Sequence, residues 1–244
     1  MKKLNIYFTA GIPHLNDTGK IAQLIQNSGA DFMEIGIPYS DPVADGPVIQ
    51  NAHIKALENG MTLSVLFKQL EEIKETVTIP KILMGYINPV MQFGFEEFCK
   101  NCSICGIYGL IIPDLPPEEF ERNYKPITDQ YDLNFIFLIT PETSEERIKY
   151  LDSLGSGFLY AVSSSSTTGS ISKNIKNEDY FNRIYNLDLK NDIFIGFGIK
   201  NKEDFLTVTE KASGGIIGTA FVNILLENNE WEEKAKTFIH SIKN

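Results

Sequence analysis

Three carboxylates in one short segment, Glu34, Asp41 and Asp45, have the types and spacing needed for acid–base chemistry. Glu34 comes at the end of an apolar run, where a carboxyl group would be desolvated. Desolvation raises the pKa of a carboxyl group toward the range useful to a general acid or base. A strand-end glutamate that forms a salt bridge to a lysine would have the same sequence, so both interpretations of Glu34 stay open.

The two aspartates follow in a loop stiffened by proline and glycine. Asp41 precedes Pro42, and Asp45 precedes Gly46. Because aspartate before proline or glycine is a common turn former, a turn is the favoured interpretation of Asp41. For Asp45, a turn and a catalytic carboxylate are both compatible with the sequence, since functional residues often lie on loops.

Glycines toward the C-terminal end could bind an anion such as phosphate. Gly196 and Gly198 follow one apolar run, and a second run over 214–217 leads through Gly218 and Thr219 into a helical pattern. Backbone N–H groups at a helix N-terminus bind phosphate without basic side chains. We therefore expect a phosphate on the amides of Gly198, Gly218 and Thr219, although tight turns without a ligand would have the same pattern. The arginines all lie in expected helices away from these loops, at Arg122, Arg147 and Arg183.

A tyrosine and a polar loop form the third candidate. Tyr160 lies near the end of an apolar run, and the loop after it, 163–170, consists of serine, threonine and glycine. This composition is typical of a loop that closes over a substrate, and equally of a plain connector. A tyrosine hydroxyl at the end of the strand favours the functional interpretation.

The elements that must position these residues alternate regularly along the chain. Most of the expected strands are continuous apolar runs, which is typical of parallel strands buried on both faces. Eight are expected: Leu4–Thr9, Asp31–Ile35, Lys81–Met84, Tyr108–Ile112, Asn134–Ile139, Gly157–Val162, Asp192–Gly196 and Gly214–Ile217.

Helical patterns fill the gaps between these strands. They are expected at Asp17–Asn27, Ile49–Glu58, Leu63–Thr76, Gly94–Lys100, Pro117–Gln130, Ser144–Leu154, Glu178–Asn186, Lys202–Glu210, Ala220–Leu226 and Trp231–Ile242. Eight strand–helix units favour an α/β fold, a closed (β/α)8 TIM barrel, and 244 residues suit that fold. No linker or low-complexity segment divides the chain, so we expect one domain over residues 1–244.

The barrel fold predicts where the site lies. In such barrels the active site is built from the loops at the C-terminal ends of the strands. The two longest of these loops are expected at 36–51 and 163–177, which makes them the candidates for catalysis and for a lid.

Composition excludes several classes of function. The net charge is −10, from 22 Lys+Arg against 32 Asp+Glu, and this charge repels nucleic acid and anionic lipid. No apolar run approaches about 20 residues, and the first residues lack a signal-peptide core, so we expect a cytoplasmic protein without membrane contact.

The spacing of Cys99, Cys102 and Cys105 imitates the start of an iron–sulfur ligand run. A fourth cysteine is missing, so we expect packed thiols and no metal.

With these elements in place, the chain resembles the alpha chain of tryptophan synthase over almost its full length. The segment from Glu34 to Gln50 is very near the family signature. Supporting matches are Phe8–Pro13, Met84–Pro89, Pro113–Pro116, Thr168–Gly169 and Gly196–Ile199.

The resemblance implies a reaction and a set of site residues. The reaction is retro-aldol cleavage of indole-3-glycerol phosphate to indole and glyceraldehyde 3-phosphate. The catalytic residues of the family fall on Glu34, Asp45 and Tyr160. Substrate contacts fall on Tyr7, Tyr86, Thr168, Gly169, Gly196, Gly198, Gly218 and Thr219.

The resemblance also implies a partner. Indole passes to a tryptophan synthase beta chain, with which an α2β2 heterotetramer is expected. Pyridoxal phosphate is expected in that beta chain, and no cofactor in this one.

Two other functions stay open at this point. Another phosphate-binding barrel, such as a sugar-phosphate isomerase, would need a lysine or histidine base at a strand end, and the sequence places none there. A subunit that only activates a beta partner would not need Glu34, Asp45 and Tyr160.

Overall fold

The strands of this protein form one parallel sheet. The structure is a computed structural model that describes residues 2–162, 172–196, 198–227 and 230–243. Its strands are β1 (Lys3–Thr9), β2 (Phe32–Gly36), β3 (Lys81–Met84), β4 (Gly109–Ile111), β5 (Asn134–Phe135), β6 (Leu138–Ile139), β7 (Phe158–Val162), β8 (Asp192–Gly196) and β9 (Gly214–Ile217). The order in the sheet is β5-β4-β3-β2-β1-β9-β8-β7-β6.

The two ends of this order close the sheet into a barrel. β5 and β6 are the two halves of the expected strand Asn134–Ile139. β5 pairs with β4, whereas β6 pairs with β7. Between the halves, the Ile136 N–H donates to the Leu110 carbonyl and the Phe137 carbonyl accepts from the Tyr160 N–H. The expected eight-stranded barrel is therefore confirmed, with its fifth strand divided into β5 and β6.

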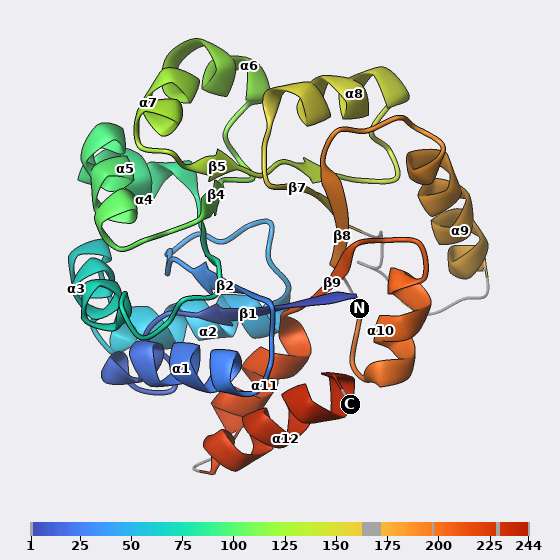
Figure 1. Cartoon of the computed structure of the whole chain (residues 1–244). Coiled ribbons are helices and arrows are strands. Elements are labelled where there is room, and N and C mark those ends of the chain that lie inside the picture. Colours follow the sequence, from blue (N-terminus) through green and yellow to red (C-terminus); the bar gives the residue numbers. More distant parts are fainter. Residues whose placement is uncertain (1, 163–171, 197, 228–229, 244) are drawn as a thin grey trace.

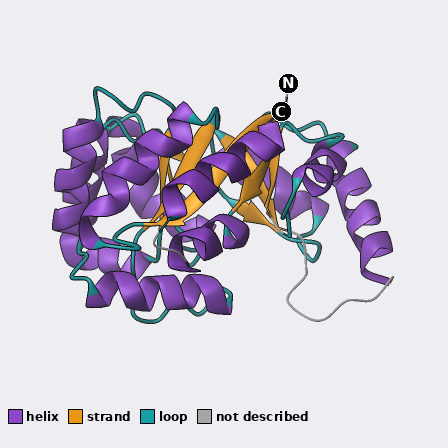
Figure 2. Ribbon diagram, turned by 90° about the horizontal axis from the view of Figure 1, so that it is seen from below, coloured by secondary structure: helices purple, strands orange, loops and turns teal. Residues whose placement is uncertain are grey.

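Helices surround the barrel (Figures 1 and 2). They are η1 (Leu15–Asp17), α1 (Thr18–Asn27), α2 (Pro47–Glu58), α3 (Leu63–Ile73), α4 (Ile87–Phe93), α5 (Phe95–Ile104), α6 (Pro117–Glu119), η2 (Phe120–Tyr124), α7 (Lys125–Gln130), α8 (Glu145–Leu154), α9 (Ser172–Tyr185), α10 (Lys202–Thr209), α11 (Thr219–Glu227) and α12 (Trp231–Lys243).

Several local features differ from the sequence-based expectation. The helix expected from Glu178 begins at Ser172 instead, so α9 includes residues 172–177 of the expected 163–177 loop. The helix expected over Pro117–Gln130 is three pieces, α6, the π-helical η2 and α7. Pro126 explains the interruption, because proline has no N–H for the helical hydrogen-bond ladder and its ring crowds the preceding turn. Another difference is α4, for which the sequence predicted no element between Gly85 and Phe93.

Two apolar layers hold the barrel together. The larger one packs the outward faces of the strands against the helices. The smaller one fills the barrel interior with branched and aromatic side chains, as is usual for this fold. The rings of Phe158 and Phe194 stack there with centroids 4.4 Å apart, and Phe32 packs edge-on against both. The barrel is thus a packed core, on which a site can be built only at its mouth.

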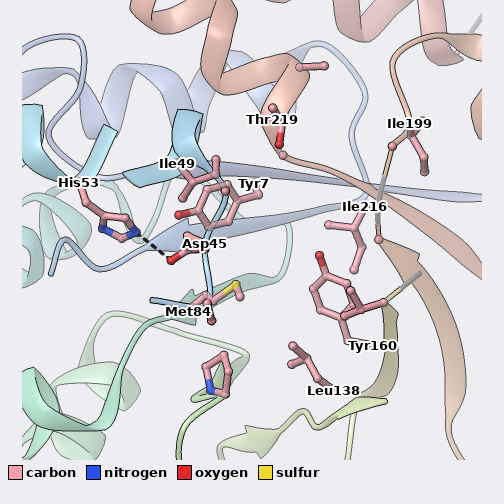
Figure 3. Close-up of a pocket in the computed structure, with 18 of the residues that line it drawn as sticks. Tyr7, Asp45, Ile49, His53, Met84, Leu138, Tyr160, Ile199, Ile216 and Thr219 are labelled. Carbon is pink, nitrogen blue, oxygen red and sulfur yellow. Dashed lines mark ion pairs between the residues drawn. The ribbon is translucent and has the colours of Figure 1, made fainter. Parts of the chain in front are cut away.

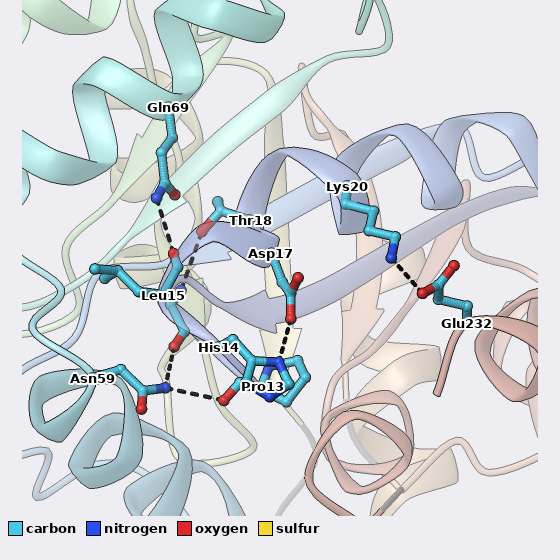
Figure 4. A network of polar contacts seen from close by, with 10 residues as sticks. Pro13, His14, Leu15, Asp17, Thr18, Lys20, Asn59, Gln69 and Glu232 are labelled. Atoms are coloured by element: carbon cyan, nitrogen blue, oxygen red, sulfur yellow. Dashed lines mark hydrogen bonds and ion pairs between the residues drawn. The ribbon is translucent and has the colours of Figure 1, made fainter. Parts of the chain in front are cut away.

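The loop after β1 is fixed by side chains from neighbouring helices (Figure 4). Asn59, which caps α2, donates to the carbonyls of Gly11 and Pro13 at 2.8 and 3.0 Å. Gln69 on α3 donates to the carbonyl of Leu15 at 2.9 Å. Gly11 has a φ of +83°, a conformation that favours glycine. These contacts tie the loop after β1 to α2 and α3.

The cysteines are structural. Cys99, Cys102 and Cys105 are free and buried at the end of α5. Among the described residues no group of histidine, cysteine, aspartate and glutamate could hold a metal ion. The burial of all three side chains confirms the expectation of packed thiols. Burial also raises the pKa of Cys99 to about 12 and of Cys105 to about 11, which keeps these thiols protonated.

Candidate active site at the barrel mouth

A cavity of about 930 Å³ opens at the C-terminal ends of the strands. This is the end at which barrels of this kind carry their active sites, and the volume is within the usual range for small-molecule pockets. Figure 3 shows Tyr7 and Asp45 on one side of this space and Tyr160 across from them.

Glu34 is fully buried on β2, next to this cavity. Its Oε1 accepts a 2.6 Å hydrogen bond from the side-chain amide of Asn5 on β1. Its Oε2 makes no hydrogen bond within the described structure. Burial raises the pKa of Glu34 to about 8, against the opposing effect of the Asn5 hydrogen bond. The salt-bridge interpretation is excluded for the described residues, because the side chain's one polar contact is Asn5 and not a lysine.

Asp45 has a different environment from that of Glu34. Its side chain is 20% exposed and lines the cavity. The Tyr86 hydroxyl donates to Asp45 Oδ2 at 2.7 Å and accepts from the Ala44 N–H at 3.0 Å. His53 Nε2 lies 3.4 Å from the same Oδ2 (Figure 3). The site therefore pairs a buried carboxyl group with one held at the surface of the pocket, a combination that separates acid and base roles.

The loop that carries Asp45 is held from α2. Gln50 donates to the backbone carbonyls of Asp45 and Pro42, at 2.9 and 3.4 Å. Asp41 is exposed, and its carboxylate accepts from the Ser40 hydroxyl at 2.5 Å. The expectation that Asp41 serves loop structure is consistent with this contact.

Two tyrosines lie beside Glu34, each over a glycine. A Cβ at Gly36 would lie 2.2 Å from the Tyr7 hydroxyl, and one at Gly196 would lie 2.3 Å from the Tyr160 hydroxyl. Both positions therefore require glycine for the rings to fit. Burial raises the pKa of both phenols, and the Glu34 carboxylate raises it further. Both hydroxyls stay protonated near neutral pH and can donate hydrogen bonds.

The opposite end of the cavity is formed by the loops after β8 and β9. Gly198, with φ +69°, and Gly218 line it, and Thr219 begins α11 there. The free N–H groups at a helix N-terminus, together with the helix dipole, attract an anion. Lys200 also lines the cavity and adds a positive charge that the sequence had not indicated. An anionic group fits this end.

Between the carboxylates and this anion site the wall is apolar. It consists of aliphatic and thioether side chains labelled in Figure 3, namely Ile49, Met84, Leu138, Ile199 and Ile216. Such a wall suits a flat, largely apolar ligand, because burying apolar surface stabilises the complex by about 25 cal/mol per Å².

The structure brings together most of the residues that the sequence singled out. Eight of them line the one cavity: Tyr7, Asp45, Tyr86, Tyr160, Gly196, Gly198, Gly218 and Thr219. Glu34 lies behind them, fully buried. Thr168 and Gly169 lie outside the described residues.

Three site residues were missed from the sequence, Asn5, His53 and Lys200. Asn5 and His53 contact the carboxylates from other elements. A buried asparagine in an apolar strand and a histidine on the helix next to the loop were the only signals for these two. Lys200 follows the Gly196–Ile199 motif directly, and its charge near the glycines was a usable signal.

Two differently placed carboxyl groups, an apolar wall and a helix N-terminus lie at the mouth of a closed parallel barrel. Together they define an enzyme of the (β/α)8 class that acts on a small anionic substrate. Sequence comparison identifies the family. The family model of the tryptophan synthase alpha chain matches residues 2–243. The chain belongs to the tryptophan synthase alpha chain family, which confirms the resemblance.

Individual relatives agree with this assignment. The chain is similar to the tryptophan synthase alpha chain of Flavobacterium psychrophilum, with 54% identity over 93% of this chain and 90% of the relative. That of Flavobacterium johnsoniae is 52% identical over 99% of this chain and 95% of the relative. Crystal structures show the same fold. The alpha subunit of Legionella pneumophila has a TM-score of 0.90 and 33% identity, covering 99% of this chain and 91% of that one. The subunit of Pyrococcus furiosus has 0.89 and 31%, covering 100% and 99%.

Family membership confirms several expectations. The chain is a carbon–carbon lyase of tryptophan biosynthesis, and the alpha chain carries no cofactor of its own, since pyridoxal phosphate belongs to the beta chain. A beta chain is its partner in the complex. Among the described helices, none has the length and apolar character needed to cross a membrane.

Proposed function

We propose that this chain cleaves indole-3-glycerol phosphate to indole and glyceraldehyde 3-phosphate, with Glu34 and Asp45 as its catalytic residues and Tyr160 beside them. The observation that carries the assignment is the contrast between the two carboxyl groups. Glu34 is fully buried with one oxygen unpaired, whereas Asp45 is partly exposed on the cavity wall.

The reaction needs a proton at the indole ring carbon that bears the glyceryl group. Glu34 has a pKa of about 8 and therefore holds a proton at pH 7. It gives this proton to the ring carbon, and the indole nitrogen becomes positively charged. The hydroxyl of the adjacent glyceryl carbon then returns a proton to Glu34, its oxygen forms the aldehyde C=O, and the carbon–carbon bond breaks with its electron pair restoring the indole ring. Glu34 ends protonated, as it began.

Asp45 stabilises the positive charge on the indole nitrogen. A carboxylate at the indole N–H stabilises the positive charge that develops there. Tyr86 holds Asp45 through its 2.7 Å hydrogen bond. Tyr160, a protonated phenol next to Glu34, can donate to the glyceryl oxygens.

The rest of the substrate matches the remaining walls. The indole ring lies against Tyr7 and the apolar wall, and the Tyr86 ring and Gly196 bound the same space. The phosphate binds at Gly198, Gly218 and Thr219, with Lys200 nearby. Thr168 and Gly169 complete the set of substrate contacts by resemblance.

The proposal includes the assembly and the location. We propose an α2β2 heterotetramer in the cytoplasm, in which the whole chain acts as one domain. Sedimentation of the mixed chains measures the stoichiometry directly.

Indole release from indole-3-glycerol phosphate tests the function. We expect equal amounts of indole and glyceraldehyde 3-phosphate, and faster release when the beta chain is added. Absence of release in the presence of a working beta chain would overturn the proposal.

A further inference from the structure

His53 lies between the backbone of the loop after β2, residues 37–46, and the carboxylate of Asp45. It is on α2, and only 2% of it is exposed. The backbone N–H of Tyr39 donates to His53 Nδ1 at 3.2 Å. On the other edge of the ring, Nε2 lies 3.4 Å from Asp45 Oδ2.

These two contacts fix the tautomer of the imidazole. A backbone N–H can only donate, so Nδ1 must be the acceptor and carries no hydrogen. In a neutral imidazole the one hydrogen then sits on Nε2. That hydrogen lies on the edge that faces the Asp45 carboxylate (Figure 3).

Both protein contacts of the Asp45 carboxylate therefore converge on one oxygen. The Tyr86 hydroxyl donates to Oδ2 at 2.7 Å, and the His53 Nε2–H faces the same atom. Among the described residues no hydrogen bond is made to Oδ1. Since Asp45 lines the cavity, Oδ1 is the oxygen left for a ligand.

We infer that His53 is a positioning residue for Asp45. Locked by the Tyr39 amide as the Nε2–H tautomer, it holds Oδ2 together with Tyr86 and so directs Oδ1 to the substrate's N–H. A residue of this kind orients the side chain that contacts the ligand but does not contact the ligand itself. The role rests on the proposed function of Asp45, but the tautomer does not.

The tautomer is measured directly in the ligand-free protein. In ¹⁵N-labelled protein, long-range ¹H–¹⁵N correlation distinguishes a protonated from an unprotonated ring nitrogen. The His14→Gln and His240→Gln variants assign the His53 signals, because the chain has 3 histidines. We expect Nε2–H with a bare Nδ1 at pH 7. An Nδ1–H tautomer or an imidazolium would overturn the inference whether or not the protein cleaves indole-3-glycerol phosphate.

A matched pair of variants separates positioning from loop support. In His53→Gln the amide nitrogen is as many bonds from Cβ as Nε2, so the donor toward Asp45 is kept and the acceptor for Tyr39 is lost. In His53→Asn the amide oxygen replaces Nδ1, so the Tyr39 contact is kept and the donor is lost.

Steady-state kinetics of indole release then give opposite results for the two roles. We expect His53→Gln to keep kcat within about threefold of wild type and His53→Asn to lose roughly tenfold in kcat with KM little changed. The reverse order would show that His53 only supports the loop, and wild-type kcat in both variants would show that it does neither; each result overturns the inference. If the wild-type protein itself releases no indole, the proposed function fails, and the tautomer measurement still decides the geometry.

Discussion

Replacement of Glu34 by glutamine should make the stability of this protein less dependent on pH. Glu34 is fully buried, and burial raises its pKa from 4.5 to about 8. A glutamine there keeps an oxygen to accept the 2.6 Å hydrogen bond from Asn5 but cannot ionise. The difference between the two proteins therefore isolates the ionisation of one side chain.

The sign follows from where the proton is bound. Below pH 4.5 Glu34 is protonated in both the folded and the unfolded chain, so the two proteins have similar free energies of unfolding. Between pH 4.5 and about 8 the unfolded chain releases the proton and the folded chain keeps it. The stability that protonated Glu34 contributes is therefore lost as the pH rises, and the loss is complete above pH 8 or so.

The magnitude follows from the same shift. A tenfold change in an ionisation constant corresponds to about 1.4 kcal/mol at 25 °C. Raising the pKa from 4.5 to about 8 therefore makes the Glu34→Gln variant more stable than wild type by up to about 5 kcal/mol at alkaline pH. This is a large fraction of the total stability of an ordinary domain.

Urea unfolding of both proteins, followed by circular dichroism from about pH 4 to about pH 9, measures this difference. We expect the two midpoints to agree at the acid end and to separate progressively as the pH rises. A constant separation at all pH values would refute the reasoning, because it would mean that Glu34 does not change its protonation on unfolding in this range.

Other substitutions test single contacts of the site. Asn5→Leu removes the amide that lowers the pKa of Glu34, so the limb of the pH–rate profile that reports Glu34 should move to higher pH; an unmoved limb would show that the 2.6 Å contact has no electrostatic effect. Gly196→Ala places a Cβ 2.3 Å from the Tyr160 hydroxyl, so the ring must move. The rate of indole release should fall roughly tenfold or more, and the free energy of unfolding, measured by thermal denaturation, should fall by about 1–3 kcal/mol. Full activity would contradict the tight fit. Tyr86→Phe removes the hydroxyl that donates to Asp45 at 2.7 Å. We expect kcat to fall roughly tenfold, with little change in the urea midpoint. An unchanged kcat would show that this contact does not contribute to the reaction.

The barrel could be predicted from the sequence because its strands are continuous apolar runs separated by helical patterns. Lys81–Met84, Asp192–Gly196 and Gly214–Ile217 have the predicted bounds, and the other expected strands except Asn134–Ile139 agree at their ends within one residue. The division of that strand was not predictable, because β5 and β6 differ in which neighbour each pairs with rather than in composition. The π-helical segment η2 before Pro126 did have a signal in the sequence, since proline inside a helical pattern disturbs the preceding turn.

The carboxylates could be predicted from the sequence, but their partners could not. Asn5 and Glu34 are 29 residues apart, on neighbouring strands, and only the pairing of β1 with β2 brings them together. His53 reaches Asp45 from the second turn of α2, and this contact depends on how the loop before the helix is folded. The resemblance supplied roles for single positions, whereas the contacts that tune each carboxylate depend on packing between elements.

The central claim, that Glu34 and Asp45 carry out the cleavage, is tested most directly by single-turnover indole release in the presence of the beta chain. We predict that Glu34→Gln and Asp45→Asn each lower the rate by at least about 100-fold while substrate binding and circular dichroism stay close to wild type. A rate within about threefold of wild type in either variant would contradict the account for that residue.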